Sequence, residues 1–583
     1  MIKAADVACA IAITDDGAPV RAFCASNTSV CTATTAALTV VRAPCASTSF
    51  TYYQDAIYWS AGRDTEGHRV APPRQPRVIL SAGTHLVSRP LPCWYPLGNS
   101  TGLHIPSGVH LTGSRDAAGA RLSVIAPAPS CDFLQQLVLI SDERVGTANM
   151  TDDARLTPAR DASLSHLALL GVQPNLSTAD AVGSWGGTPW LDSALSCDSS
   201  QQAGSRVVHG VTVSAAAAIT IDGVLVRGVQ NTGIQLGLFS QFLPDTAADV
   251  HNPGCANESW CLGKRLLVLD ATVRASGVCA ALQGVTVIGR NVTVVNNSIA
   301  VTTQTWTSAA SLFGITMGVS AGFVGSAEVV VANNTIHGGD YAVGCDGSFP
   351  LYTPVQLFDT HWGDILRCYP SWRAKYPGGP VNHSAVPAPE LILRGNDFVL
   401  AQQVLLDLAS AHHAASSDPR QNDVGFISSL QLLHNTVRGS VCGVSIYRTR
   451  DSLVADNSLE AAAGQPLAMF GVSVSASHNN VVSGNRLAGW RVALQALGAP
   501  LDDPRGCGSC QSRWGSSQNT FLGNTAHNSS AGVILGYGGD AGRDNQVASN
   551  IMAADVELPC DYSHAFSTNA LDNAPESCNT IML

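Results

Sequence analysis

Two aspartates and one histidine lie close together in the segment HGGDYAVGCDGS, which begins at His337. Asp340 and Asp346 flank the stretch 341–343, for which a short strand is predicted. Paired carboxylates about 5 to 9.5 Å apart hydrolyse glycosidic bonds. The three residues are therefore candidate catalytic residues. Asp beside Gly is also a common turn residue, so a purely structural role at corners of the chain is the alternative.

The segment 349–389 that follows is rich in aromatic and charged side chains, although only 6% of the chain is aromatic. Planar rings with polar rims pack on the apolar faces of sugars, and Arg and Lys bind carboxylates. The segment is expected either to wall a glycan-binding groove or to be a loop that buries its own aromatic residues. Its candidate substrate-binding residues are Tyr352, Asp359, Trp362, Arg367, Trp372 and Lys375.

A lyase would need a base, together with positive charge that neutralises a uronate and stabilises a carbanion. Arg448 and Arg450 in SIYRTRDS are the best paired cations, and Arg448 is a further candidate substrate-binding residue. Val444 and Ile446 share their parity, so the arginines point outward only if the chain bends after Tyr447. A solvated corner is the alternative. No metal site or cofactor is predicted, although a lyase could use Ca²⁺.

The elements that would position these residues are predicted from a recurring phrase. It consists of two or three apolar or small residues, a short polar step, Asn, one variable residue and an apolar residue. The intervals between the marked asparagines are 37, 62, 39, 22, 28, 39 and 26 residues. Most of these intervals fit one or two turns of a coil of about 20 to 25 residues. The marked residues are Asn297, Asn334, Asn396, Asn435, Asn457, Asn485, Asn524 and Asn550.

Short alternating strands in such a chain bury Val, Ile and Leu inside the coil. An Asn can adopt a left-handed bend at a corner, and its amide can bond the equivalent Asn one coil away. The phrase therefore predicts a solenoid whose asparagines are stacked on a common edge. Unrelated β-hairpins, whose turns also use Asn and Gly, are the alternative. Hairpins would not favour a one-sided Asn at coil-length intervals.

Three segments near the start of the chain read YQDAIYWSAG at 53–62, RVILSAGTHLVSRPL at 77–91 and GLHIPSGVHLTGS at 102–114. They resemble the opening of the pectate lyase superfamily, the pectin-lyase-like proteins. With the Asn-marked coils the resemblance covers residues 50–556. It implies an all-β fold, a right-handed single-stranded parallel β-helix with a short N-terminal capping helix and long inter-coil loops. The family's Gly-His-Gly, Arg-Ile-Lys and Trp-Ile-Asp-His motifs are absent, so the resemblance assigns no catalytic residue.

The predicted organisation has four parts. Residues 1–50 form a poorly defined N-terminal segment that is interpreted as a truncated leader. Residues 51–130 form the cap and the first coils, and residues 131–556 form the β-helix with its aromatic-rich insertion at 349–389. Residues 557–583 form a C-terminal tail that a disulfide is expected to staple.

The sequence predicts neither a nucleic-acid partner nor a membrane span. Net charge is −11, and Lys and Arg are scattered without a basic run that could neutralise successive phosphates. The stretch 308–327 carries no charge and is long enough to cross a bilayer. Its Gly and Ser residues and its β-patterned neighbours indicate buried coils instead, so no membrane span is predicted.

Seventeen Cys and ten Asn-x-Ser/Thr acceptors favour an oxidising secretory route. Loop disulfides are expected for Cys255 with Cys261, for Cys507 with Cys510, and for Cys560 with Cys578. The chain is therefore expected to be a secreted or cell-surface glycoprotein. The acceptors are Asn27, Asn99, Asn149, Asn175, Asn257, Asn291, Asn296, Asn333, Asn382 and Asn528.

Together these features predict a monomeric carbohydrate-active protein that acts on an extracellular polysaccharide as a glycosidase or a polysaccharide lyase. The alternative is a non-catalytic β-helix that binds glycans or serves as a structural surface protein. The missing family motifs favour the alternative. The aromatic insertion beside Asp340 and Asp346 favours the enzyme.

Overall fold

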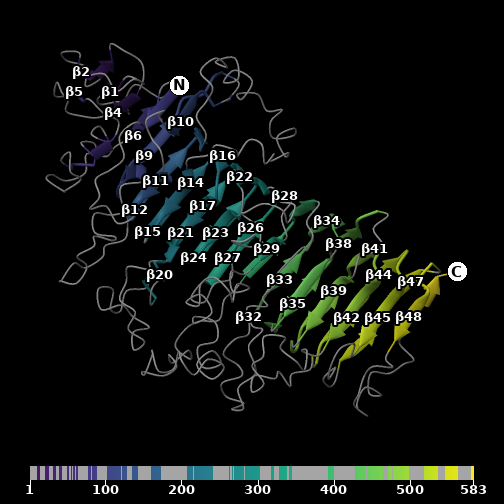
Figure 1. The fold of residues 1–583 in the computed structure, drawn as a ribbon. Coiled ribbons are helices and arrows are strands. Elements are labelled where there is room, and N and C mark those ends of the chain that lie inside the picture. The colour runs from purple at the N-terminus through teal and green to yellow at the C-terminus, as the bar shows by residue number, and fades with distance from the viewer. Residues whose placement is uncertain are drawn as a thin grey trace, which may run out of the picture. The chain divides into compact units, whose positions relative to one another are not determined.

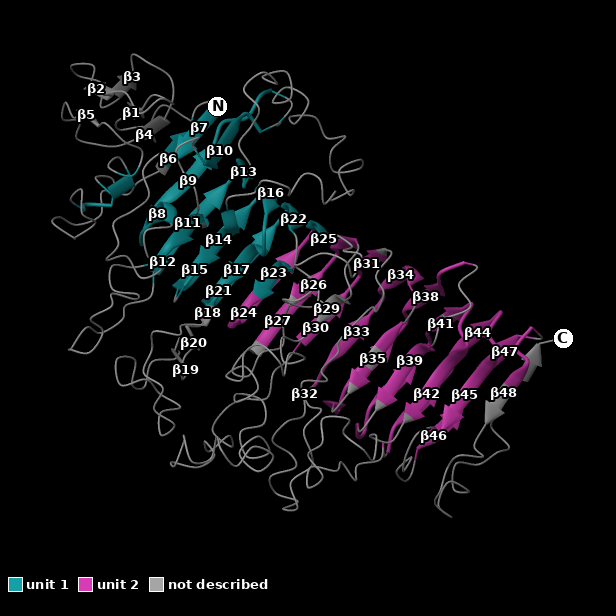
Figure 2. Ribbon diagram, viewed as in Figure 1, with its two compact units in different colours: residues 1–244, 251–286, 297–302 teal, residues 245–250, 287–296, 303–583 magenta. Residues whose placement is uncertain are grey.

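The computed structural model describes the coils of the chain and leaves out most of the long segments that join them. Apart from short gaps, it describes residues 77–87, 101–127, 134–141, 159–171, 207–239, 261–301, 317–320, 327–344, 391–399, 427–463, 470–497, 516–535, 545–561 and 580–582, with isolated residues and short strands before position 64. The chain divides into two compact units (Figure 2). Unit 1 contains residues 1–244, 251–286 and 297–302, and unit 2 contains residues 245–250, 287–296 and 303–583.

Unit 1 contains three sheets, which are named A1, B1 and C1 here, and two small antiparallel sheets. Sheet A1 contains, in order, β1 (Ala10–Ile13), β4 (Leu38–Val41), β6 (Arg77–Leu80), β9 (His110–Gly113), β12 (Ala159–Ser165), β15 (Ala216–Asp222) and β21 (Val268–Arg274). Sheet B1 contains β7 (Gly83–Val87), β10 (Ser123–Pro127), β13 (Ala168–Leu170), β16 (Leu225–Val229), β22 (Gly277–Ala280) and β25 (Ser298–Val301). Sheet C1 contains β8 (Thr101–Ile105), β11 (Leu134–Ile140), β14 (Val207–Val213), β17 (Thr232–Leu236) and β23 (Gln283–Val287). The small sheets contain β2 (Val20–Cys24), β3 (Cys31–Ala33) and β5 (Ser49–Phe50), and β18 (Leu238–Phe239), β19 (Cys261–Leu262) and β20 (Arg265–Leu266).

Unit 2 contains three sheets, A2, B2 and C2, and two smaller strand pairs. Sheet A2 contains β24 (Gly289–Val295), β27 (Ala327–Ala332), β30 (Leu391–Arg394), β33 (Gln431–Leu433), β37 (Leu453–Ala455), β40 (Val481–Ser483), β43 (Thr520–Leu522) and β46 (Gln546–Ala548). Sheet B2 contains β28 (Thr335–His337), β31 (Asp397–Val399), β34 (Thr436–Ser440), β38 (Ser458–Ala461), β41 (Arg486–Ala488), β44 (Thr525–His527), β47 (Ile551–Ala553) and β49 (Thr580–Met582). Sheet C2 contains β35 (Val444–Tyr447), β39 (Phe470–Ser475), β42 (Val492–Leu497), β45 (Ala531–Leu535) and β48 (Leu558–Asp561). The pairs are β26 (Met317–Ser320) with β29 (Tyr341–Gly344), and β32 (Ile427–Ser428) with β36 (Thr449–Arg450).

Successive strands of unit 2 belong to the three sheets in rotation. The chain passes from β37 in A2 to β38 in B2 and β39 in C2, and it returns to A2 at β40. Each strand pairs in parallel with the equivalent strand one coil away: β37 pairs with β40, and β38 pairs with β41, as Figure 1 shows. The fold is a right-handed single-stranded parallel β-helix, as the sequence predicts.

The core of each coil is built from inward-facing apolar side chains that stack on their equivalents in the next coil. In sheet A2 the register places Leu432, Val454, Val482, Phe521 and Val547 one above the other, and all five are buried. A strand buries one side chain in two, because successive side chains point to opposite faces. The inward positions therefore hold the fold, and the outward positions remain for other uses.

A ladder of buried asparagines runs along the corner between sheets A2 and B2. Asn435 accepts bonds from the backbone N–H and the side-chain amide of Asn396, at 3.0 and 2.9 Å. Its own amide donates to the carbonyl of Leu393 at 3.0 Å and to Asn457 Oδ1 at 2.9 Å. The same bonding links the ladder members Asn334, Asn396, Asn435, Asn457, Asn485, Asn524 and Asn550. The predicted common edge of stacked asparagines is thereby confirmed.

The left-handed bend at this corner is not made by the ladder asparagine itself. The residue before it has the positive φ, for example 54° at Asn333, 55° at His434 and 56° at Asp456. The expectation that one Asn serves both purposes is therefore wrong for this corner. The bend turns the chain from one sheet into the next, and the Asn that follows it points inward. Its amide there bonds backbone N–H and carbonyl groups that no strand partner satisfies at the corner.

A second, shorter ladder stands at the corner that leads into sheet A2. Asn480 is bonded to Asn519 at 2.9 Å, and Asn519 is bonded to Asn545 at 3.0 Å. The backbone N–H of Ser452 donates to Asn480 Oδ1 at 3.1 Å. This ladder was not predicted, because the sequence around these residues lacks the complete phrase.

The N-terminal edge of unit 1 is closed by side-chain bonds. Gln54 Nε2 donates to the carbonyl of His104, and the backbone N–H of His104 donates to Gln54 Oε1, at 2.8 and 2.7 Å. The amide of Gln54 thus takes the place of a neighbouring strand at the end of β8. Gln54, Ile57 and Tyr58 have helical backbone, but no complete helix is among the described elements, so the predicted capping helix is shown only in these three residues.

No helix of the described residues is long and apolar enough to cross a membrane. The uncharged stretch 308–327 contains strand β26, in which Val319 is buried, in agreement with the predicted coil.

Replacing Asn435 with Ala should lower the free energy of unfolding by about 2 to 4 kcal/mol, because it leaves several buried groups without partners. Those groups are the backbone N–H and one side-chain N–H of Asn396, together with the carbonyl of Leu393. Urea unfolding followed by circular dichroism measures the change. Asn528→Gly is the matched control, because Asn528 is exposed at a positive φ of 45° and should tolerate Gly with little effect. Equal losses in the two variants would contradict a stabilising role for the ladder.

His209 on β14 should make the folded state sensitive to acid. Burial lowers its pKa to about 4, and Nδ1 has no hydrogen-bond partner among the described residues. The unfolded chain binds the proton more readily, so stability is complete above about pH 6.5 and falls as the pH drops towards 4, by roughly 3 kcal/mol in all. Urea unfolding at a series of pH values should show a shallower acid loss for His209→Gln than for the wild type. The same pH profile in both proteins would refute this assignment.

Candidate functional site

The outward side of sheet B2 carries a polar surface. Side chains at the first and third positions after each ladder asparagine point away from the core, and the registers place them in two rows across the strands. The polar ones are all exposed or half-buried, and the other such positions hold the apolar residues Val399, Ala488, Ile551 and Ala553. This surface, called the polar face, comprises Thr335, His337, Asp397, Thr436, Arg438, Ser458, Glu460, Arg486, Thr525 and His527.

Charges of both signs alternate along the polar face from one coil to the next. Asp397 lies on β31, Arg438 on β34, Glu460 on β38 and Arg486 on β41. Neighbouring strands are about 4.8 Å apart, so one charged side chain is presented at each step of that length. The surface is long, regular and hydrophilic, unlike the apolar pockets that suit small hydrophobic ligands.

Arg438 and Asp397 form a bidentate ion pair at the centre of the polar face. Arg438 Nε donates to Asp397 Oδ1 at 3.2 Å, and Nη2 donates to Oδ2. The side chains are 57% and 32% exposed, so the pair is open to solvent and to a ligand. Glu460 stands beside Arg438 in register on the following strand. The three side chains form an acid–base–acid sequence across three coils.

His337 is the one predicted catalytic residue that the structure describes, and it lies on the polar face. It is half-buried on β28, in the same row as Arg438 and two strands away, which is about 10 Å. Burial lowers the pKa of His337 below its usual range. The ring is therefore neutral at pH 7, with one nitrogen that can accept a hydrogen bond and one that can donate.

The strand predicted between Asp340 and Asp346 is confirmed as β29. It pairs with β26, so it does not belong to the sheet that carries His337. The two aspartates themselves lie outside the described residues, and their catalytic role stays a prediction. The same holds for the predicted substrate-binding residues Tyr352, Asp359, Trp362, Arg367, Trp372, Lys375 and Arg448.

The predicted parity around Arg450 is confirmed. Val444 and Ile446 are buried, β35 ends at Tyr447, and a new strand, β36, begins at Thr449. Arg450 therefore lies on a different strand from Val444 and Ile446, where it is half-buried beside His478. Because Arg448 lies outside the described residues, the pair of outward cations stays a prediction.

Sequence reasoning missed Asp397, Arg438 and Glu460. The signal was present, because each follows a ladder asparagine by one or three residues. Aligning the repeated phrase on its Asn and reading the first and third positions after it would have identified the polar face. The repeated phrase does not give the pairing register between strands of successive coils, which decides that these three residues are neighbours.

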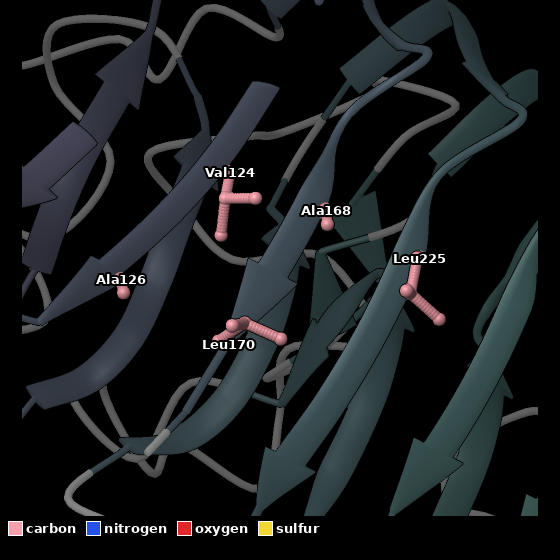
Figure 3. Packing of buried hydrophobic residues seen from close by; sticks show 5 residues of the cluster. All are labelled: Val124, Ala126, Ala168, Leu170 and Leu225. Atoms are coloured by element: carbon pink, nitrogen blue, oxygen red, sulfur yellow. The ribbon is translucent and has the colours of Figure 1, made fainter. Parts of the chain in front are cut away.

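The outward side of sheet B1 in unit 1 is different. Val124, Ala126, Ala168, Leu170 and Leu225 lie together on β10, β13 and β16 (Figure 3). Each of these side chains is at most 6% exposed. Ile125, Leu169 and Val226 occupy the alternate positions of the same strands and are also buried, so both faces of the strands are covered here. Around these five residues this side of B1 is apolar and closed to solvent, although Thr84, Arg227 and Ser298 on the same side are half-buried.

Among the described residues no group of three His, Cys, Asp or Glu side chains is arranged to hold a metal ion. On the polar face itself, Arg438 separates the two carboxylates in the order of strands. A guanidinium between two carboxylates fills the place that a shared cation would take.

The described strands define a parallel β-helix with a polar outer surface. No protein-family model matches the sequence, and no curated protein is significantly similar to it.

Solved structures of the same fold are similar to the chain at low identity. The A-module of the mannuronan C-5 epimerase AlgE4 of Azotobacter vinelandii is 14% identical, with 84% of this chain and 90% of that chain covered and a TM-score of 0.40. A double mutant of the tailspike protein of E. coli bacteriophage HK620, in complex with a pentasaccharide, is 11% identical, with 88% and 73% covered and a TM-score of 0.45. Gene product 12 of bacteriophage phi29 is 12% identical, with 85% and 54% covered and a TM-score of 0.42.

Removing the charge of Arg438 should change stability by less than about 1 kcal/mol, because its ion pair with Asp397 is exposed and screened by solvent. Urea unfolding of Arg438→Gln and wild-type protein measures the difference. A loss as large as that expected for Asn435→Ala would show that the charges of the polar face serve the fold and not a ligand.

Proposed function

We propose that the protein binds an extracellular polysaccharide along the polar face of unit 2. The observation that carries the proposal is the row of outward side chains on sheet B2, in which every strand from β28 to β44 presents at least one exposed or half-buried polar side chain. A flexible small molecule would fill only part of such a surface. A linear polymer with a regular repeat can contact successive coils with equivalent groups.

The side chains of the polar face suit the hydroxyl groups of sugars. Carboxylates such as Asp397 and Glu460 accept hydrogen bonds from hydroxyl groups, while Arg438 and Arg486 donate to hydroxyl or ring oxygens. The neutral ring of His337 can do either. Because acids and bases alternate, the face has little surplus charge and favours hydroxyl-rich segments over a strongly charged polymer.

An extracellular ligand fits the acceptor motifs for N-glycosylation. The acceptors that fall on described residues are all exposed, and each has a positive φ that projects it from a bend. They are Asn291, Asn296, Asn333 and Asn528. Exposure is necessary for modification, which supports the proposed secretory route.

Glycoside hydrolysis is the second candidate function. Asp397 and Glu460 lie on the same face of sheet B2. Their strands are two apart, and Glu460 is offset from Asp397 by two residues along the strand direction. At ideal spacing their Cα atoms are therefore about 12 Å apart. Side chains that lean towards each other from such positions can reach the roughly 6.5 to 9.5 Å separation of inverting enzymes. In that case Asp397, positioned by its ion pair with Arg438, would act as the base and Glu460 as the acid.

Binding should be tested with a panel of neutral and acidic plant, algal and bacterial polysaccharides, by affinity electrophoresis followed by calorimetry on the best ligand. We expect Arg438→Gln and Glu460→Gln each to weaken binding about tenfold, since each removes a charge-assisted hydrogen bond. Arg491→Gln is the control, because Arg491 is an exposed arginine of unit 2 that lies outside the polar face. Unchanged affinity in both polar-face variants, or no ligand in the panel, would contradict the proposal.

Turnover of the same panel tests the hydrolase. New reducing ends released by the wild type, and lost more than a hundredfold in Asp397→Asn and Glu460→Gln, would support these two carboxylates as the catalytic pair. Activity that survives in both variants and disappears in Asp346→Asn would instead place the catalytic pair at Asp340 and Asp346. Binding without any turnover would leave the protein a non-catalytic glycan binder.

A further inference from the structure

The corner between sheets A1 and B1 lacks the asparagine ladder over its first coils. The ladder positions there are Leu167, Val224 and Ser276, of which the first two cannot donate side-chain hydrogen bonds to the next coil. The bends themselves are retained, with positive φ at His166, Gly223 and Ala275. The backbone N–H of Val224 donates to Ser276 Oγ at 3.1 Å, which leaves the carbonyls of Gly223 and Ala275 to find another donor.

Arg121 serves that purpose. It lies in the segment between β9 and β10, and its Nε donates to the carbonyl of Gly223, while Nη2 donates to the carbonyl of Ala275 at 3.3 Å. One guanidinium thus links the bends of two successive coils. A Cβ at Gly223 would lie 2.7 Å from His166 Nδ1 and 3.5 Å from Arg121 Nη2, so Gly is required there both for its φ of 63° and for space.

The same corner gathers two further guanidiniums. Arg115 donates from Nη2 to Nδ1 of His166, which fixes the proton of that ring on Nε2. Arg274 at the end of β21 pairs with Asp222 at 2.9 Å. His166, Asp222 and Arg274 lie at the ends of the equivalent strands β12, β15 and β21. Their side chains therefore project from neighbouring coils.

The electrostatic balance of this cluster is positive. It contains Arg115, Arg121 and Arg274 against Asp222, and the neighbouring Asp116 is the other carboxylate of the same segment. Even with Asp116 included, the positive charges outnumber the negative ones. Burial and the charge of Arg115 lower the pKa of Arg121 to about 10 and that of His166 to about 4. The ring is therefore neutral at pH 7, as a fourth positive charge would be repelled.

We propose that Arg115 and Arg274, supported by Arg121 between them, form a binding site for an oxyanion group such as a sulfate ester or inorganic sulfate. Arg115 and Arg274 are exposed, and the hydrogen bond of Arg115 to a neutral ring leaves its charge uncompensated by that partner. Guanidinium donors arranged as a fork match the geometry of sulfate and phosphate oxygens. The site lies in unit 1 and does not involve the polar face of unit 2.

Calorimetric titration with sodium sulfate at constant ionic strength, balanced with chloride, tests the site in the full-length protein. Arg115→Gln keeps a donor for His166 but removes the charge, and it should weaken sulfate binding about tenfold. Asp222→Asn removes the competing carboxylate of Arg274 and should strengthen binding several-fold. Arg160→Gln is the control, because Arg160 is an exposed arginine at the opposite end of the strand that leads to His166.

The source of the anion is distinguished by two further ligands, a sulfated oligosaccharide and its desulfated counterpart. Tighter binding of the sulfated form, lost in Arg115→Gln, identifies a sulfated glycan. Binding of free sulfate with the same variant pattern, but none of the oligosaccharide, identifies the site as one for a free anion. The proposal is overturned if sulfate does not bind, or if Arg115→Gln and Arg160→Gln behave alike. Glu460→Gln should leave sulfate binding unchanged, so failure here is separable from failure of the proposed polysaccharide function.

Discussion

The buried asparagine ladder of unit 2 is the constraint on which the arrangement of its side chains depends. An amide that donates twice and accepts twice must find all its partners at fixed distances, and only one register between successive coils provides them. A slip by one residue would orphan the buried amides and also turn the apolar side chains outward. The ladder therefore determines which residues face solvent, and the polar face follows from it although no ladder member belongs to it.

The insertions tolerated between ladder members follow from the same constraint. Ladder neighbours are separated by between 22 and 62 residues, yet the bonding at each step is equivalent. Lengthening a loop costs entropy only slowly, roughly with the logarithm of its length, whereas breaking one ladder step leaves several buried groups unsatisfied. Long segments can thus be added between coils without loss of register, which is why loops of very different length coexist with regular sheets.

The repeated phrase made the fold predictable from sequence, because the Asn, the preceding bend and the apolar positions recur locally. The strand at 341–344 and the buried parity of Val444 and Ile446 were predictable for the same reason. Contacts between residues distant in sequence were not. Arg121 bonds a carbonyl 102 residues away, and Arg438 reaches a carboxylate 41 residues away. No local pattern encodes such partners, and the register that brings them together becomes visible only once the coils are stacked.

In a chain with only 13% charged residues, where the charges are placed carries information. On the polar face, acid and base alternate from strand to strand, so the fields of neighbouring charges largely cancel and the surface presents donors and acceptors without a strong net potential. At the corner of unit 1, three guanidiniums outnumber their carboxylates and a histidine is kept neutral among them. Cancelled charge favours hydroxyl groups, and surplus positive charge favours oxyanions. Arg121 bonds the backbone of two bends, whereas Arg115 and Arg274 bond only side chains and are exposed, so these two are the guanidiniums that the proposed anion would contact.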